Sequence, residues 1–575
     1  MTSSSLVLGP LLRHVDDTAA SVWVEVAAPG TVSVRATAPD GTTYDASAGT
    51  FTAHGHHYAL VCLSGLPPGT RLPYVVRVDD QQVWPEPGSD LPAPVVPTLE
   101  PGKPLRLAYG SCRTSVSHDA DGNGTHGVDA LRAYALRMAG LTHAGPDDPD
   151  DPDRDEPRWA DLVLFLGDQV YADETTAAMQ DFIEQRRGLD SEPGAELKDY
   201  EEYAHLYTLA WSDPVNRWLL STLPSLMIFD DHDVRDDWNT SQAWKDAMEA
   251  TSWWRMRILG GLASYWVYQH LGNLTPAERD ADEVWARVQE LAAAGEDAGP
   301  YLDGFAERAD ADPTAYRWSF ARDLGPQARL VVVDSRAARV LDPARRSILD
   351  DDEMDWLDGQ LRGDVDHLLI GTSLPFLLAP GLHYVEAFSE ALAGGAWGPR
   401  AARVGERIRQ GVDLEHWAAF QDGFQRVARM VLSVARGERG RAPATVTFLS
   451  GDVHHSYLSE AVASRRDRRA HGPIRSRVLQ AVCSPIRNPL PIRMRYATAV
   501  ASYGVAGPIG RVVGKSAKVP DAPMRWRLTR GPWFDNNLAT LEVHGRGLRL
   551  WWATGEVEGD AHDRPRLVRV ADVSL

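Results

Sequence analysis

The chain has 575 residues, of which 43% are hydrophobic and 24% charged, as in ordinary globular proteins with a buried core. At this length, we expect two domains or one large decorated domain. The net charge of −21 argues against general nucleic-acid binding, because no basic excess exists to neutralise a phosphate backbone, whereas a local cationic or metal-bearing cleft could still attract phosphate esters. The cysteines, Cys62, Cys112 and Cys483, are too few for a disulfide framework and suit a reducing compartment.

Residues 1–98 alternate short β-rich runs with turns. Ser21–Val26 and Tyr74–Val78 show the period of two that is typical of half-buried strands. The turn between Leu66 and Tyr74 resembles the entry to a late strand of fibronectin type III-like domains. We therefore expect a small antiparallel β-sandwich in residues 1–98, joined by a linker in residues 99–104 to a second domain in residues 105–575.

From Leu105 onward, strand-like runs alternate with helical ones, which predicts an α/β layered fold. Helices are expected at Val128–Ala139, Tyr200–Leu209, Ser241–Gln269, Asp280–Ala293 and Leu414–Glu438. The segment Pro489–Trp533 is rich in Arg, Gly and Pro and contains a largely apolar patch at Ala497–Val513. This segment forms either a lid over a site or an irregular surface excursion. A closing hairpin is expected after it.

Four apolar runs in this region each end in a polar loop. The loops begin at Gly110-Ser-Cys112, Gly167-Asp168, Asp230-Asp231-His232 and Gly451-Asp452-Val-His454. Ligands of open α/β sheets bind beyond the carboxyl ends of the strands, where these side chains fall. Rigid supports, several carboxylate oxygens and imidazole nitrogen are what a polynuclear metal site requires. The pattern predicts a metalloenzyme, with Asp168 as the candidate bridge between two cations.

In this order, the four motifs resemble those of the alkaline phosphatase D (PhoD-like) branch of the calcineurin-like metallophosphoesterases. The strand end Asp334-Ser-Arg336 is similar to a further element of that family. The resemblance covers residues 105–575 and implies a four-layer α/β/β/α metallophosphoesterase sandwich. It also implies a phosphoester hydrolase of alkaline phosphatase or phosphodiesterase type, in which metal-activated hydroxide attacks phosphorus in line.

The resemblance further implies a set of metal ligands. An Fe³⁺ ion would be held by Cys112, Asp168, Tyr171, Asp452 and His454. Thiolate and phenolate are strong anionic donors that favour a transition metal of high charge, which agrees with this set. Ca²⁺, or another divalent metal, would lie beside it on oxygen ligands. Asp168 and Asp231 are expected to hold that metal, with Asp230, Asp237 and Asn239 as further candidates.

Three residues are expected to act on the phosphoester itself. His232 resembles the family's histidine that assists the leaving group or orients phosphate. Arg113 and Arg235 are expected to form charge-assisted forks to phosphate oxygens, with a surface ion pair as the alternative for Arg235. Asp334 and Arg336 are expected to be architectural.

Some features of the motifs stay open. The third motif has Asp231 where the wider superfamily has an amide ligand, which favours a harder or more positively charged metal. His455 should point away from His454 in an extended backbone, with contact to the second metal or the substrate as the alternative. His54 and His56 are expected to lie on a solvated strand, with a transition-metal site as the alternative.

Two other functions remain open beside small-molecule phosphoester hydrolysis. One is a metal-bearing binding or scaffold protein with a closed cleft. The other is a phospholipase-D-like phosphodiesterase that uses the Ala497–Val513 patch at a lipid surface. The start of the chain lacks a basic region and a twin-arginine pair, and no run of about 18 apolar residues occurs. We therefore expect a cytoplasmic protein without a transmembrane segment, although an exported mature form would look the same.

Overall fold

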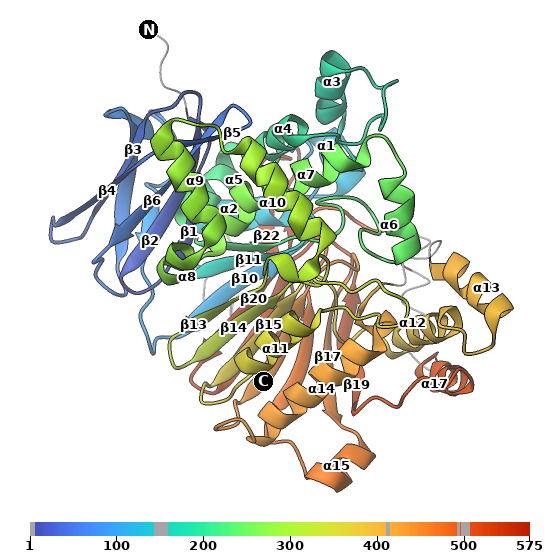
Figure 1. The fold of residues 1–575 in the computed structure, drawn as a ribbon. Helices are drawn as coiled ribbons and strands as arrows, with labels where there is room; N and C mark the ends of the chain where they lie inside the picture. Colours follow the sequence, from blue (N-terminus) through green and yellow to red (C-terminus); the bar gives the residue numbers. More distant parts are fainter. Residues whose placement is uncertain (1–5, 143–158, 410–414, 492–494, 496–505) are drawn as a thin grey trace.

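In a computed structural model that describes residues 6–142, 159–409, 415–491, 495 and 506–575, the N-terminal part of the protein forms two antiparallel sheets (Figure 1). Their strand orders are β1-β2-β6-β5 and β4-β3-β7-β8, with β9 paired to β7. The strands are β1 (Leu6–Val15), β2 (Ala19–Val26), β3 (Thr31–Thr37), β4 (Thr43–Gly49), β5 (Phe51–Ala53), β6 (His56–Ser64), β7 (Arg71–Val78), β8 (Gln81–Trp84) and β9 (Val95–Pro97). Every second residue of β7 is buried, as the period of two predicts, and these side chains join a core of their own.

The rest of the chain is built on two larger mixed sheets. The first has the order β12-β11-β10-β20-β21-β22 and the second β13-β14-β15-β16-β18-β17-β19. The first sheet consists of β10 (Leu105–Gly110), β11 (Leu162–Leu166), β12 (Ser225–Ile228), β20 (Leu538–His544), β21 (Gly547–Glu556) and β22 (Arg566–Ser574). The second consists of β13 (Phe320–Leu324), β14 (Ala328–Val333), β15 (His367–Thr372), β16 (Thr445–Ser450), β17 (Ser456–Ala463), β18 (Arg477–Val482) and β19 (Met524–Trp533). The predicted closing hairpin is β20–β21, which pairs with β10 inside the first sheet.

The two sheets pack face to face, with helices outside them (Figure 1). A Cβ atom on Gly371 of β15 would lie 3.3 Å from the Leu164 side chain of β11, so the inner faces are in close contact there. Helix α2 (Ala130–Met138) packs on the first sheet, and α11 (Asp351–Gln360) and α14 (Gln421–Arg436) pack on the second. The four-layer α/β/β/α fold is therefore confirmed.

The other helices surround this sandwich. They are α1 (Ala120–His126), α3 (Ala177–Arg186), α4 (Tyr200–Trp211), α5 (Pro214–Thr222), α6 (Gln242–Glu249), α7 (Trp254–Tyr265), α8 (Pro276–Ala281), α9 (Glu283–Ala294), α10 (Gly299–Ala311), α12 (Pro380–Ala393), α13 (Pro399–Arg409), α15 (Arg465–His471) and α17 (Ala506–Ser516). Among the described residues, no helix is long and apolar enough to cross a membrane.

One predicted helix is interrupted. The sequence pattern favoured a continuous helix over Ser241–Gln269, whereas α6 ends at Glu249 and α7 begins at Trp254. The Thr251 hydroxyl donates to the Met248 carbonyl at 2.8 Å and so competes with the helical hydrogen bonds at the break. After α7, the chain forms one π-helical turn at Trp266–His270. This turn carries Gln269 towards the strand ends.

The carboxyl ends of β10, β11, β12 and β16 meet because the first three run parallel in one sheet and the fourth faces them from the other. Two glycines permit the loops there to approach each other. A Cβ on Gly167 would lie 2.5 Å from the Asp230 Cβ, and Gly167 also has a φ of +104°. A Cβ on Gly451 would lie 2.0 Å from the Ser111 hydroxyl oxygen. Only a residue without a side chain fits at either place.

The N-terminal sheets are anchored to the larger sheets by a fully buried arginine. Arg13 of β1 donates from Nη1 to the Tyr268 carbonyl at 2.9 Å and from Nη2 to the Gln269 carbonyl at 2.6 Å. It also donates from Nε to the Ser225 carbonyl at 3.2 Å, at the start of β12. Burial lowers the pKa of Arg13 to about 9. The buried Arg13 guanidinium therefore finds these three hydrogen-bond acceptors only when the N-terminal sheets pack against the rest of the chain.

A second contact between the two parts contains histidine. His56 lies 2.8 Å from Glu25 through Nδ1 and 3.0 Å from Glu201 of α4 through Nε2. His54 lies 3.0 Å from Asp303 of α10 through Nε2. We expected a solvated strand for these histidines. Instead, they lie in a turn and at the start of β6, and they contact acidic side chains of α4 and α10.

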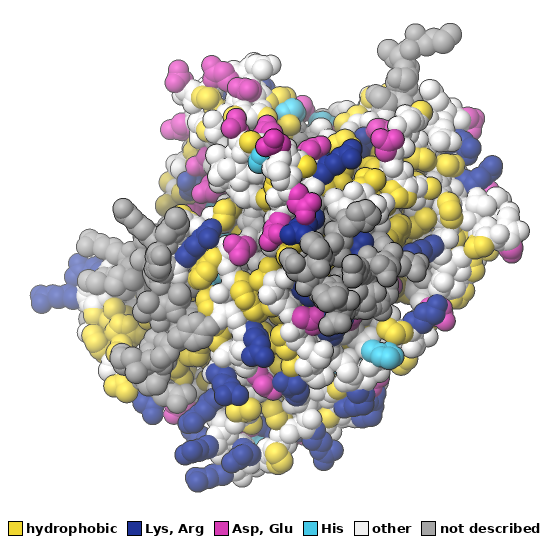
Figure 2. Space-filling model, turned by 180° about the vertical axis from the view of Figure 1, so that it is seen from behind, with side chains coloured by type: hydrophobic (Ala, Val, Ile, Leu, Met, Phe, Trp, Pro, Cys, Tyr) yellow, Lys and Arg dark blue, Asp and Glu magenta, His cyan; other side chains and the backbone are white. Residues whose placement is uncertain are grey.

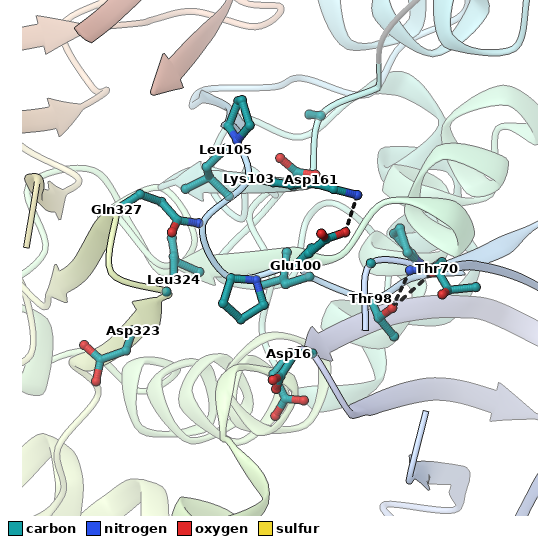
Figure 3. Close-up of a pocket in the computed structure, with 18 of the residues that line it drawn as sticks. Asp16, Thr70, Thr98, Glu100, Lys103, Leu105, Asp161, Asp323, Leu324 and Gln327 are labelled. Carbon is teal, nitrogen blue, oxygen red and sulfur yellow. Dashed lines mark hydrogen bonds and ion pairs between the residues drawn. The ribbon is translucent and has the colours of Figure 1, made fainter. Parts of the chain in front are cut away.

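Residues of the segment 99–104, which connects the N-terminal sheets to β10, line a pocket of about 430 Å³ (Figure 3). Lys103 forms an ion pair with Glu100 inside it, and Gln327 Oε1 accepts a hydrogen bond from the Gly102 amide at 2.9 Å. None of the residues that line the pocket is a predicted metal ligand.

Replacing Gly451 by Ala tests the close approach of the strand-end loops. The new methyl would collide with Ser111, so we expect a destabilisation of about 1–3 kcal/mol in urea unfolding, as for other overpacked sites. Gly359→Ala in α11 is the matched control, because a Cβ there meets nothing within 4 Å. An equal effect of the two substitutions would contradict the close approach.

The His56 contact predicts a stability that depends on pH. Burial disfavours the charged ring, but hydrogen bonds and charges from Glu25 and Glu201 outweigh burial and raise the pKa of His56 to about 9. Because the folded pKa exceeds the unfolded one, this stabilisation is complete below about pH 6.5 and is lost as the pH rises through about 9. We expect His56→Gln to lower the melting temperature most at low pH and least above pH 9. The exposed His544→Gln should show no such trend, and a pH-independent difference for His56→Gln would rule out the charged pair.

Candidate metal centre

Four predicted iron ligands have strained backbones. Cys112, Asp168, Asp452 and His454 have φ angles of 58°, 48°, 67° and 49°. These values lie in the left-handed region that residues other than glycine seldom adopt. Such strain persists where the surroundings hold it in place and is concentrated at functional sites. All four residues lie within four residues of the ends of β10, β11 or β16.

The Cys112 sulfur lies among loops from both sheets. Its Sγ is 3.3 Å from Asp168 Oδ2, 3.7 Å from the Asp452 carbonyl oxygen and 3.2 Å from the Ser484 hydroxyl. Burial, followed by the charge of Asp452, raises the pKa of Cys112 to about 12. The thiol would therefore become a thiolate only beside a strong positive charge such as a metal ion.

Tyr171 and the backbone of His454 also contact this group of residues. Burial, then the neighbouring Cys112 and Asp168, raises the pKa of Tyr171 well above its usual value. The His454 amide donates to the Ser484 hydroxyl at 3.2 Å, and that hydroxyl also contacts Cys112. The structure thus places Tyr171 beside Cys112 and Asp168, and the His454 backbone beside the same Ser484 hydroxyl, while their role as iron ligands stays a prediction.

A cluster of carboxylates adjoins this set. Asp168, Asp230 and Asp231 each offer an oxygen within 4.8 Å of the others. Burial and nearby negative charge raise the pKa of both Asp168 and Asp230 well above the usual range. Asp168 Oδ1 and Asp230 Oδ2 are buried and have no hydrogen-bond partner among the described residues. Hard anionic oxygens without partners, beside a thiol and a phenol, fit the metal ions that the sequence predicts.

Arg336 lies inside this cluster, although the sequence favoured an architectural role for it. Its fully buried guanidinium forms an ion pair with Asp230, and its Nη2 lies 3.0 Å from Asp231 Oδ1. Its Nη1 lies 2.5 Å from Glu415 Oε2, and Asp452 is 3.8 Å away. Arg336 therefore binds the candidate ligands directly and neutralises part of their charge.

Sequence reasoning missed Glu415 and His416. Asp231, Glu415 and Asp452 form a second group of oxygens within 4.8 Å of one another. His416 lies 2.8 Å from Asp452 Oδ2 through Nε2 and 2.8 Å from Glu386 Oε1 through Nδ1. Both residues fall in a stretch predicted as helix, whereas α14 begins only at Gln421. No motif marks them, so only the folded chain places them at the centre.

His232 has a carboxylate partner that was also missed. Its Nδ1 lies 2.9 Å from Asp173 Oδ1, and Asp173 also accepts the Asp236 amide at 2.6 Å. Burial opposes protonation of the ring, but Asp173 and Asp231 outweigh burial and raise the pKa of His232 well above its usual value. Asp231, His232 and Asp236 form a third candidate group, and the Asp236 side chain is 67% exposed. The centre therefore reaches solvent on this side.

The further calcium candidates lie at the edge of the carboxylate cluster. The Asp237 amide donates to Asp231 Oδ2 at 3.0 Å, and Asn239 donates from Nδ2 to the Arg336 carbonyl at 3.3 Å. Asn239 Oδ1 is buried without a hydrogen-bond partner among the described residues and remains available as a ligand.

The two predicted phosphate-binding arginines are paired within the protein. Arg113 donates from Nη2 to Asp129 Oδ2 at 2.8 Å and from Nη1 to the Ala210 carbonyl at 2.9 Å. Arg235 donates from Nε to Glu196 Oε2 at 3.0 Å, which is the ion pair considered as the alternative. A role for either one in phosphate binding stays a prediction.

His455, the neighbour of His454, contacts its own loop and strand. Its Nδ1 lies 2.6 Å from the Val453 carbonyl, and its ring packs on Tyr457.

Asp233 holds two of the strand-end loops together. Its Oδ2 accepts the backbone amides of Asp168 and Asp230, both at 2.9 Å. Its Oδ1 accepts Gln269 Nε2 at 3.2 Å, and Arg13 binds the Gln269 carbonyl. A chain of hydrogen bonds thus leads from the N-terminal sheets to the two loops that carry the carboxylate cluster.

Two parts of the chain match protein-family profiles. Residues 154–491 match the profile of the PhoD-like phosphatase family, and residues 3–96 match a domain of unknown function, DUF7800. The expected likeness of the N-terminal domain to fibronectin type III domains stays a prediction. No significant match was found among curated proteins.

Among solved structures, that of PhoD is similar in fold, and a purple acid phosphatase is matched more weakly. The match to the structure of PhoD covers 100% of this chain and 91% of the PhoD chain, with 13% identity and a TM-score of 0.57. The match to the purple acid phosphatase PPD1 from yellow lupin (Lupinus luteus) seeds covers 98% of this chain and 74% of the PPD1 chain, with 11% identity and a TM-score of 0.47. The family profile spans more than half of the chain. The chain therefore belongs to the PhoD-like phosphatase family and is, on that membership, a metal-dependent phosphoesterase.

Proposed function

We propose that this protein hydrolyses small phosphomonoesters or phosphodiesters by in-line attack of water on phosphorus, with iron and calcium as its metals. The observation that carries the proposal is the convergence of Cys112, Asp168, Asp231 and Asp452 around buried carboxylate oxygens that lack partners. Such a donor set suits two adjacent cations of different character.

Iron would be held by Cys112, Asp168, Tyr171, Asp452 and His454. The contacts of Cys112 Sγ with Asp168 Oδ2 and with the Asp452 carbonyl, and the burial of Tyr171 beside Cys112, support this assignment. Calcium would be held by Asp168 and Asp231, with Asp230, Asp237 and Asn239 as further candidates. Bound metals of this kind lower the pKa of water and neutralise the charge of phosphoryl oxygens.

His232 is suited to donate a proton to the leaving oxygen. Asp173 accepts from Nδ1, which fixes the orientation of the ring and leaves Nε2 as the atom that carries the transferable proton. The exposed Asp236 beside it marks the side from which a substrate enters.

The serines of the strand-end loops are not proposed as nucleophiles. Ser111 and Ser456 are fully buried, and the Ser111 hydroxyl accepts the Asp452 amide at 3.1 Å. The solvent-facing edge at Asp236 does not favour the closed-cleft scaffold. The lipid-surface alternative depends on Ala497–Val513, of which residues 497–505 lie outside the described part of the chain.

Asp168→Asn tests the metal-dependent reaction. We expect hydrolysis of p-nitrophenyl phosphate and bis-p-nitrophenyl phosphate to be chelator-sensitive in the wild type. The variant should be slower by at least about 100-fold, because even outer-shell partners of metal ligands contribute 10–100-fold. Asp161→Asn, at the opposite end of β11, is the matched control and should stay within about twofold of wild type. Chelator-resistant turnover, or equal rates for both variants, would contradict the proposal.

His232→Gln tests the proton donor. We expect a loss of about 10²–10⁴-fold for alkyl esters, whose leaving groups need a proton, and a much smaller loss for p-nitrophenyl esters. His205→Gln on α4 serves as the control for a partly exposed histidine elsewhere. A loss that is the same for every leaving group would exclude His232 as the donor.

A further inference from the structure

A basic groove of about 1010 Å³ lies at the end of the molecule occupied by α15. It is lined by Arg429, Arg465, Arg466, Arg469, Lys515 and Arg525. These residues come from α14, α15, α17 and the start of β19, so four separate elements direct cations into one hollow. Figure 2 shows Lys and Arg side chains gathered at this lower end of the molecule, although the whole chain carries a net charge of −21.

The groove is separate from the metal centre. Strands β17 and β19 run antiparallel, with Ser456 paired to Trp533 beside the metal-centre loop and Ala463 paired to Met524 beside the groove. The eight residues of β17 span roughly 25 Å at about 3.3 Å per residue. A ligand in the groove therefore does not reach the candidate metal ligands.

Most of the positive charge in the groove is unpaired. Arg465, Arg466, Arg469 and Arg525 are exposed and form no ion pair with any residue that the structure describes. Of the two acidic residues in the lining, Asp467 pairs with Arg436, and Asp521 lies 3.9 Å from Lys515. Like charges held close together repel one another, so an anion that binds among them is favoured.

We propose that this groove binds a compact, soluble anion with several linked phosphate groups. Its volume is that of a small-molecule site, and arginine side chains bind phosphate oxygens in forked pairs. Four unpaired guanidinium groups match three or more phosphate charges better than a single phosphate. The inference goes beyond the proposed function and does not depend on it.

Calorimetric titration with inorganic tripolyphosphate tests the groove. The full chain would carry Asp168→Asn, so that turnover does not consume the probe. We expect Arg465→Ser/Arg466→Ser/Arg469→Ser to weaken binding by at least about tenfold, since three exposed charge contacts are removed. The affinity of this triple variant should also fall less steeply with salt.

A triple variant of equal charge, Arg345→Ser/Arg362→Ser/Arg441→Ser, is the matched control, because these arginines lie outside the groove. Chelation of metal by the probe contributes equally to both variants, so the difference in Kd reports the groove. Binding that is equal in the two variants, or absent from both, would overturn the proposal. Stronger groove-dependent binding of a single-stranded oligonucleotide than of tripolyphosphate would also overturn it, because the ligand would then not be compact.

Vesicles with multiply phosphorylated headgroups distinguish the source of the phosphates. Groove-dependent binding of tripolyphosphate without co-sedimentation supports a soluble ligand. Co-sedimentation that the groove variant abolishes, with no tripolyphosphate binding, would overturn the assignment to a soluble anion and place the phosphates on a lipid.

Discussion

Buried carboxylates that lie close together repel one another, and this repulsion controls the chemistry of the strand-end centre. Burial and neighbouring charge raise the pKa of Asp168 and Asp230 well above the usual range. Arg336 offsets part of the charge through Asp230 and Asp231, but oxygens of Asp168 and Asp230 keep no partner among the described residues. Such a site holds either protons or metal ions, and the two compete. Of these two alternatives, metal binding at neutral pH also gives the buried Cys112 a role, as a thiolate ligand beside the positive charge of the metal.

The loops that carry the candidate ligands are held in place by hydrogen bonds to residues that are not themselves candidate ligands. Asp233 accepts the amides of both Asp168 and Asp230, and Gln269 holds Asp233. Arg13 of the N-terminal sheets in turn holds the backbone at Gln269. The N-terminal domain thus contributes to the rigidity of the centre without supplying a candidate ligand, and rigid support is what a metal site with fixed geometry needs.

The strand-end motifs could be predicted from the sequence because each joins an apolar run to polar residues at a fixed position. That pattern predicted an α/β layered fold with metal-binding carboxylates at the strand ends. The four-layer sandwich and the ligand set that includes Asp168 and Asp452 followed from the resemblance to the PhoD-like family. Glu415 and His416 could not be predicted in the same way, since they lie in a loop before α14 within a stretch whose pattern predicted a helix, and no motif marks them. Arg336 was found, but its role was not, because ion pairs across two sheets depend on packing rather than on local sequence.

The measurement that tests this account most directly is the metal content of the purified protein, determined by elemental analysis across pH. The account predicts about two or more metal ions per chain near neutral pH, including one transition metal, with loss on acidification as protons take their place. A folded and hydrolytically active protein with no bound metal at neutral pH would contradict the account.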